Sequence, residues 1–245
     1  MTHGDSLFLT VESTHRSLQE RLDEALAPHR DPDRPRDGHS STDAFLAATS
    51  RHLAAVEAVL VPTLCRKAPD SGVLAKEYLQ AARHLERTLS LVKARVYGEA
   101  HAVHMSWPGL WSLAKEQLTE HNRLEQKLVE KVIEHDDPDD LDGLARKLFD
   151  AETRGPTRPH PFLPHTGMLS LVTRRMWAMA DRFWDHAEGR VIPEPVHPVP
   201  HRHDSLMSQY LVGDPHFDTS ARLVNRRRRA APSPATPAPD EISDS

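Results

Sequence analysis

This chain is poor in several features that would assign it to a familiar class. Its single cysteine, Cys65, excludes an internal disulfide and is typical of a reducing compartment. No apolar run is long enough to span a bilayer, and residues 1–5 lack the basic start of a secretory signal, so we expect a cytoplasmic protein with no membrane partner. The formal net charge of -5 gives no general attraction to nucleic acid, which we therefore do not expect as a partner.

Motifs for common catalytic chemistry are also missing from the sequence. It contains neither a glycine-rich phosphate loop nor a serine nucleophile elbow. Cys65 has no histidine and acid at a recognisable spacing, so we interpret it as a small apolar residue near a helix end. We therefore expect a binding protein rather than an enzyme.

No segment alternates polar and apolar residues for long enough to predict a strand. Apolar residues instead recur every three or four positions in four segments, over about residues 5–27, 41–62, 73–97 and 108–136. We expect Pro62 to bend or end the second segment. Short connections favour antiparallel neighbours, so the pattern predicts an all-α, antiparallel four-helix up-down bundle.

Proline divides the chain, because 13 of its 20 prolines lie after residue 155. We expect the bundle to occupy residues 1–135. Residues 136–190 should form a helical, proline-rich extension that packs on the bundle or on a partner. Residues 191–245 have the composition of a mostly disordered tail.

The strongest functional signal is a set of four histidines, each placed by periodicity on the inward stripe of a different helix. They are His15, His52, His84 and His121, and the separation is 69 residues both from His15 to His84 and from His52 to His121. Glu125 lies one turn after His121 on the same stripe. A metal ion is one way to compensate such buried polar groups, and mutual hydrogen bonding is the other. The pattern predicts a metal site in the bundle core.

These residues also resemble a known family. Thr14-His15-Arg16, His52-Leu-Ala-Ala-Val-Glu57, His84 and His121-Asn-Arg-Leu-Glu125, in this order on four helices, resemble the hemerythrin-like, cation-binding HHE domain over about residues 5–135. The run from Pro156 to Gly167 resembles a tail of actinobacterial members. The resemblance implies a non-haem di-iron centre that binds or senses O2, or handles NO or peroxide.

Two positions depart from the family pattern. Val56 stands where the second helix usually supplies a bridging carboxylate, with Glu57 one residue further on, and Thr88 stands where the third helix usually supplies a second ligand. The remaining donors suit one ion better than two. A di-iron centre, a single-ion site and an empty bundle therefore all stay open. The candidate metal ligands are His15, His52, Glu57, His84, His121 and Glu125.

Residues Met168–Glu188 predict a further amphipathic helix. Met176, Met179 and Phe183 share its apolar face, and the opposite face carries both Asp181 and Arg182. Such a mixed polar face argues against docking on an anionic membrane. We expect the apolar face to cover the bundle or to bind a protein partner or a second copy. The alternative function is thus a metal-free bundle that serves as a protein-interaction module through this helix.

Overall fold

A computed structural model describes residues 5–27, 37–96, 104–136, 138–160, 168–188, 190 and 192–198. Every regular element within these ranges is helical, which confirms the all-α class for the described part of the chain. The elements are α1 (Asp5–Leu26), α2 (Asp37–Lys67), the 3-10 helix η1 (Pro69–Ser71), α3 (Gly72–Val96), α4 (Trp107–His135), α5 (Pro138–Arg154) and α6 (Met168–Glu188). All six α-helices belong to one compact unit within residues 1–201.

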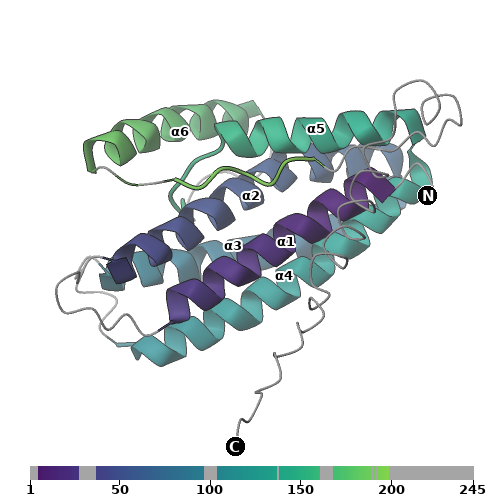
Figure 1. The fold of residues 1–245 in the computed structure, drawn as a ribbon. Helices are drawn as coiled ribbons and strands as arrows, with labels where there is room; N and C mark the ends of the chain where they lie inside the picture. Colours follow the sequence, from purple (N-terminus) through teal and green to yellow (C-terminus); the bar gives the residue numbers. More distant parts are fainter. Residues whose placement is uncertain are drawn as a thin grey trace, which may run out of the picture. The chain divides into compact units, whose positions relative to one another are not determined.

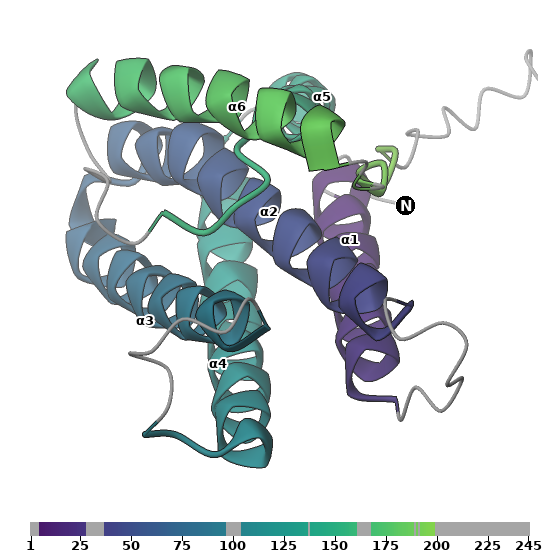
Figure 2. The same cartoon turned by 90° about the vertical axis from the view of Figure 1, so that its left-hand side faces the viewer.

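Helix α2 lies at the centre of the helix contacts. It packs against α1, α3, α4 and α5, while α4 also contacts α1 and α3 (Figures 1 and 2). Helix α5 lies against both α1 and α2, so the expected extension contributes to the packing around the first four helices. Of the tail expected over residues 191–245, only residues 192–198 are described.

The composition of α2 reflects this central position. Its segment His39–Lys67 is long and apolar enough to cross a membrane by length and composition, which differs from our expectation of no such run. However, 78% of its most apolar window is buried inside the protein, as in the core helix of a soluble protein. It is the one candidate span among the described residues.

Two boundaries of α2 differ from the sequence prediction. The helix begins at Asp37, before the expected start near residue 41, and it continues through Pro62 to Lys67 instead of ending there. Proline removes one backbone hydrogen bond from a helix, at a cost of about 3 kcal/mol. Burial of Leu60 and Leu64, both 0% exposed, on the same turns offsets that cost and keeps the helix continuous.

Helix α6 has the predicted bounds, but it packs by its polar face. Asp181 and Asp185 are 2% and 5% exposed, whereas Met176, Met179 and Phe183 are between 63% and 69% exposed. The possibility that the apolar face covers the chain's own bundle is therefore wrong for these residues. Amphipathic periodicity identifies two faces of a helix, but only the available partners decide which face is buried.

The hydrogen-bond donors to Asp181 and Asp185 come from the segments just before and just after α6. Asp181 Oδ2 accepts hydrogen bonds from the backbone N–H groups of Thr157 (2.9 Å) and Arg158 (3.0 Å). Asp185 accepts one from the Thr157 hydroxyl and another from Nη1 of Arg190 at 2.7 Å. These charge-assisted bonds compensate the burial of both carboxylates.

Candidate metal centre

Three ligand-type side chains from three helices meet in the core. Val11 and Leu18 flank His15 on the buried stripe of α1, Leu128 follows Glu125 on α4, and His52 lies midway along α2. The apolar stripes thus place an imidazole or a carboxylate inside the protein at one level. His15 is 6% exposed, and Glu125 is fully buried.

The three side chains converge on one carboxylate oxygen. Nε2 of His15 lies 3.0 Å from Oε2 of Glu125, and Nε2 of His52 lies 2.9 Å from the same oxygen. One ligand atom from each residue lies within 4.8 Å of the others, and this is the one such histidine and acid group among the described residues. Two imidazoles and one carboxylate are a common donor set for a transition-metal ion.

A second carboxylate contacts the other nitrogen of the His52 ring. Oε1 of Glu152, on α5, lies 2.8 Å from Nδ1 of His52. With both ring nitrogens facing carboxylates, the imidazole donates from both in the metal-free protein. Burial alone would lower the pKa of His52, but Glu125 and Glu152 outweigh it and raise the pKa to about 10.

Glu125 stays ionised because of the imidazoles beside it. Burial favours its neutral form, but the positive charge of His52 and the hydrogen bonds from His52 and His15 hold the pKa of this carboxyl well below its usual range. The core therefore contains a carboxylate that two imidazoles already orient. Such preorganisation favours a ligand role over a purely apolar packing role.

His121 lies at the edge of this group. Its Nδ1 is 3.8 Å from Oε2 of Glu125, and the hydroxyl of Tyr78 on α3 donates to its Nε2 at 2.9 Å. Burial lowers the pKa of His121 to about 4, so the ring is neutral at physiological pH. His121 thus faces Glu125 from one turn away while its other nitrogen is occupied by Tyr78.

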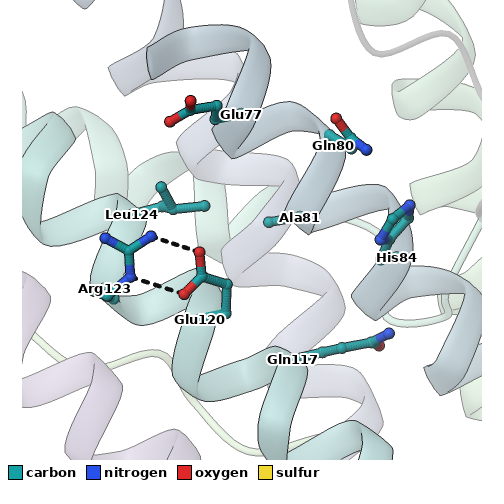
Figure 3. A pocket seen from close by; sticks show the side chains of 8 residues that line it. All are labelled: Glu77, Gln80, Ala81, His84, Gln117, Glu120, Arg123 and Leu124. Atoms are coloured by element: carbon teal, nitrogen blue, oxygen red, sulfur yellow. Dashed lines mark hydrogen bonds and ion pairs between the residues drawn. The ribbon is translucent and has the colours of Figure 1, made fainter. Parts of the chain in front are cut away.

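His84 does not join the site, so its expected inward position is wrong. The side chain is exposed on the outer surface between α3 and α4, where it lines a shallow pocket with Gln117 and Glu120 (Figure 3). The buried stripe of α3 instead contains Tyr78 and Leu85. The helix is rotated by about one residue, or about 100 degrees, from the stripe that would place His84 inside.

The remaining candidates are buried without entering the ligand group. Glu57 is 5% exposed, but its carboxylate is not among the ligand atoms that lie together. Val56 packs in the apolar core, and Thr88 is 3% exposed. The expected positions of a bridging carboxylate and of a second α3 ligand thus carry no strong metal donor.

The donors present fit one ion and do not fit two. Oε1 of Glu125 is buried without a hydrogen-bond partner, so this carboxylate is not fully satisfied by protein alone. One ion between His15, His52 and Glu125 would use donors that already converge. The di-iron centre that the family resemblance implies would need further bridging carboxylates and a histidine from α3, which are not among the ligand atoms that meet here in the described residues.

Two residues at the centre were not among the predicted site residues. Glu152 continues the buried stripe of α5, four residues after Leu148 and eight after Leu144, and that register was a usable signal. Periodicity correctly predicts Tyr78 in the core, but its contact with His121 depends on how α3 packs against α4. Periodicity placed the inner faces of α1, α2 and α4 but not that of α3, and it did not indicate which helix supplies each neighbour.

Comparison with protein-family models, curated proteins and solved structures finds no match to this chain.

Proposed function

We propose that this chain is a hemerythrin-like bundle that binds one non-haem iron ion through His15, His52 and Glu125. In this proposal the protein is cytoplasmic and senses or handles O2, NO or peroxide. The observation that carries the proposal is the convergence of both Nε2 atoms on Oε2 of Glu125 in the core. Burying these groups together is costly unless they are fully paired or bind a metal, and Oε1 of Glu125 has no protein partner.

The donor set supports iron and is also compatible with zinc. A ferrous ion held by two histidines and one carboxylate keeps coordination positions open to a small molecule. Zinc uses similar ligands, so the choice of iron rests on the family resemblance together with this donor set. Elemental analysis distinguishes the two metals directly.

Other residues of the chain would hold the metal ligands in position. Glu152 holds Nδ1 of His52 at 2.8 Å, which leaves Nε2 as the metal-facing nitrogen and orients the ring. Tyr78 and His121 add a hydrogen-bonded pair beside Glu125. Burial of the whole cluster excludes bulk water, so access would be limited to small ligands.

The decisive experiment is metal analysis of matched histidine variants. The full chain is purified without a histidine tag from iron-replete cells, and bound metals are measured by mass spectrometry beside the ultraviolet-visible spectrum. We expect about one iron per chain in the unchanged protein and at least a tenfold loss in His52→Ala. The matched control is His84→Ala, which removes an exposed histidine from a neighbouring helix and should keep the metal.

Any of four results would overturn this proposal. Iron retained in His52→Ala, or lost equally in His84→Ala, would locate the metal elsewhere on a chain with 17 histidines. About two irons per chain, together with oxo-bridge absorption, would show a di-iron centre and not a single ion. A protein without metal after anaerobic addition of ferrous iron would leave an empty bundle.

The second candidate function is association through α6, and the exposure of its apolar face favours it. Met176, Met179 and Phe183 are more than 60% exposed, and Trp177 and Trp184 are about half exposed. Leu169, Val172, Met176, Met179 and Phe183 also alternate steps of three and four residues, the spacing of a coiled-coil seam. A second copy of α6 offers the same seam, so we take a homodimer as the occupant of this face.

Light scattering of the full chain tests this second function. The unchanged protein should be a dimer at micromolar concentration, and Trp177→Ala combined with Trp184→Ala should give a monomer with unchanged helicity. The control His186→Ala changes an exposed residue of the same helix and should stay dimeric. A monomeric unchanged protein would rule out the homodimer.

A further inference from the structure

A short segment after α6 crosses the outside of the helices close to the candidate metal centre. Residues 192–198, which we call the strap, have the sequence Ile-Pro-Glu-Pro-Val-His-Pro and form no helix. Figure 1 shows the strap passing over α2 beside α5. Its three prolines restrict the backbone before docking, so little conformational entropy is lost when the strap packs against these helices.

The strap contacts both α2 and α5. Nη2 of Arg51, on α2, donates a hydrogen bond to the carbonyl oxygen of Pro193. The ring of His197 packs against the ring of Phe149, on α5, with the two centroids 4.8 Å apart. The strap therefore bridges these two helices through one hydrogen bond and one ring contact.

An ion-pair network fixes the chain just before the strap. Nη1 of Arg190 lies 2.7 Å from Oδ1 of Asp185, and Nη2 lies 3.1 Å from Oδ1 of Asp43 on α2. The Arg190 side chain is 8% exposed, so bulk water and salt screen these pairs only weakly. The start of the strap is thus held to both α6 and α2.

Arg51 connects the strap to the candidate metal centre. It directly precedes His52 in α2, and it is buried. Burial lowers the pKa of its guanidinium, whereas the negative charge of Glu152 opposes that shift, so these two side chains interact electrostatically. The side chain that binds the strap is therefore close to the carboxylate that lies 2.8 Å from Nδ1 of His52.

The end of α5 approaches α2 closely at the same place. A Cβ atom on Gly155 would lie 3.3 Å from Cα of Arg51, which is tighter than most contacts of this kind, so glycine permits the approach. The backbone N–H of Gly155 also donates to the carbonyl oxygen of Glu152 at 3.1 Å. Contact between Gly155 and Arg51 thus helps to set how near Glu152 comes to His52.

The last turn of α5 depends on such contacts because the apolar core does not hold it. Leu141, Leu144 and Leu148 are each at most 5% exposed and anchor the earlier turns of the helix. Residues 149–154, all of them described, contribute no buried hydrophobic side chain to the core. Removal of the strap should therefore loosen this last turn, which carries Glu152, before the rest of the helix.

We propose that the strap is a latch on the candidate metal centre: while it is docked on Arg51 and Phe149, it keeps Glu152 in contact with His52. Release of the strap lets Glu152 move away and removes the acceptor of Nδ1–H of His52, which lowers the affinity for metal about tenfold. By linkage, metal bound at His52 favours the docked strap by the same factor. The effect on metal rests on the proposed iron site, whereas the contact between Glu152 and His52 does not.

Proton NMR of the metal-free full chain tests the latch without relying on iron. The downfield imidazole N–H signal that is lost in His52→Asn and shifted in Glu152→Gln reports the hydrogen bond between these two side chains. Replacement of residues 192–198 by a glycine–serine sequence of the same length should speed exchange of this proton with water about tenfold. The matched control is Glu194→Gln, at an exposed position of the strap, which should leave the exchange rate unchanged.

A second pair of variants tests the contact at the end of α5. Gly155→Ala should speed exchange of the same proton, because the added methyl group pushes α5 away from Arg51. Gly143→Ala, on the same helix, is the control, since a Cβ atom there meets nothing within 4 Å. Amide exchange in α3 and α4 should be unchanged in every variant, which separates loss of the latch from general unfolding.

Competition with a chromophoric chelator then measures the iron affinity, which should fall about tenfold in the strap replacement and stay unchanged in Glu194→Gln. A chain that binds no iron would overturn the proposed function, while the exchange rate of the His52 proton still decides whether the strap holds Glu152 in place. An unchanged exchange rate in the strap replacement, or an unchanged iron affinity despite faster exchange, would overturn the latch.

Discussion

At the scale of single residues, His52 links two carboxylates that come from different helices. Nε2 faces Glu125 on α4, and Nδ1 faces Glu152 on α5. In a metal-free protein the ring is a buried cation between two anions. In a metal-bound protein the same geometry would give a neutral imidazole whose Nδ1–H donates to Glu152.

The stability of the metal-free protein should depend on pH through His52 and His121. The raised pKa of His52, about 10 against an ordinary 6.5, stabilises the fold fully below pH 6.5, and this contribution is lost as pH rises toward 10. The lowered pKa of His121, about 4, has the opposite effect, because its contribution is present above pH 6.5 and is lost as pH falls toward 4. We expect the highest melting temperature of the chelator-treated protein near pH 6.5.

Circular dichroism melts at pH 5, 6.5 and 8.5 measure this dependence. His52→Asn should make the melting temperature nearly constant above pH 6.5. Its fall below pH 6.5 should be unchanged. A melting temperature of the unchanged protein that rises steadily from pH 6.5 to 8.5 would contradict the charge state assigned to His52.

Replacement of Glu152 should weaken metal binding without removing a ligand. Glu152→Gln keeps an oxygen acceptor for Nδ1 of His52 but removes the negative charge that orients and polarises the ring. Changes at such supporting positions typically lower metal affinity about 10- to 100-fold. Competition with a chromophoric chelator measures the affinity, and Asp150→Asn, at an exposed position of the same helix, is the matched control. Equal affinities for both variants would show that Glu152 does not support the site.

At the scale of elements, α6 shows that amphipathicity does not by itself choose the buried face. The flanking segments place hydrogen-bond donors beside Asp181 and Asp185, so the polar face is satisfied in the interior. The apolar residues then remain outside, where a second copy of the helix would cover them. Helix α3 shows the same rule, because its rotation buries Leu85 and exposes His84.

Loss of the Asp181 carboxylate should loosen α6 selectively. Asp181→Ala leaves the buried N–H groups of Thr157 and Arg158 without their acceptor, which we expect to cost about 3 kcal/mol. Amide hydrogens of α6 should then exchange about 100-fold faster, while those of α2 and α4 change little. Hydrogen exchange with mass spectrometry measures the difference, with His186→Ala as control. Uniform acceleration over all helices would show that α6 does not open independently.

At the scale of the whole molecule, the candidate centre joins helices that are distant in the sequence. His15, His52, Glu125 and Glu152 come from α1, α2, α4 and α5, so an ion at this point would bind only the assembled fold. Helix α5, which follows the predicted bundle, therefore contributes a residue to the candidate centre.

Ferrous iron should accordingly stabilise the whole protein. At a free concentration 100 times the dissociation constant, binding to the folded state alone adds about 2.7 kcal/mol to the free energy of unfolding. For a chain of this size the melting temperature should rise by about 5–10 °C. Calorimetry under anaerobic conditions checks the shift in the unchanged protein and in His15→Ala, where it should disappear. An equal shift in His15→Ala would assign the stabilisation to binding elsewhere.

The sequence alone determined the helical elements and much of the candidate centre. Periodicity correctly placed His15, His52, His121 and Glu125 inside, because a helix repeats locally and its inner face follows from neighbouring apolar residues. The bounds of α6 were also predicted, since they depend on nearby residues.

Only the tertiary structure decided the rotation of α3, the arrival of Glu152 at His52 and the buried face of α6. On α3, two stripes one residue apart are both rich in apolar side chains and share Tyr78, so periodicity does not separate them. Glu152 meets His52 across 100 residues of sequence, and Asp181 meets Thr157 across a connection between two helices. Local spacing determines which residues share a helix face, whereas packing against other helices determines what that face contacts.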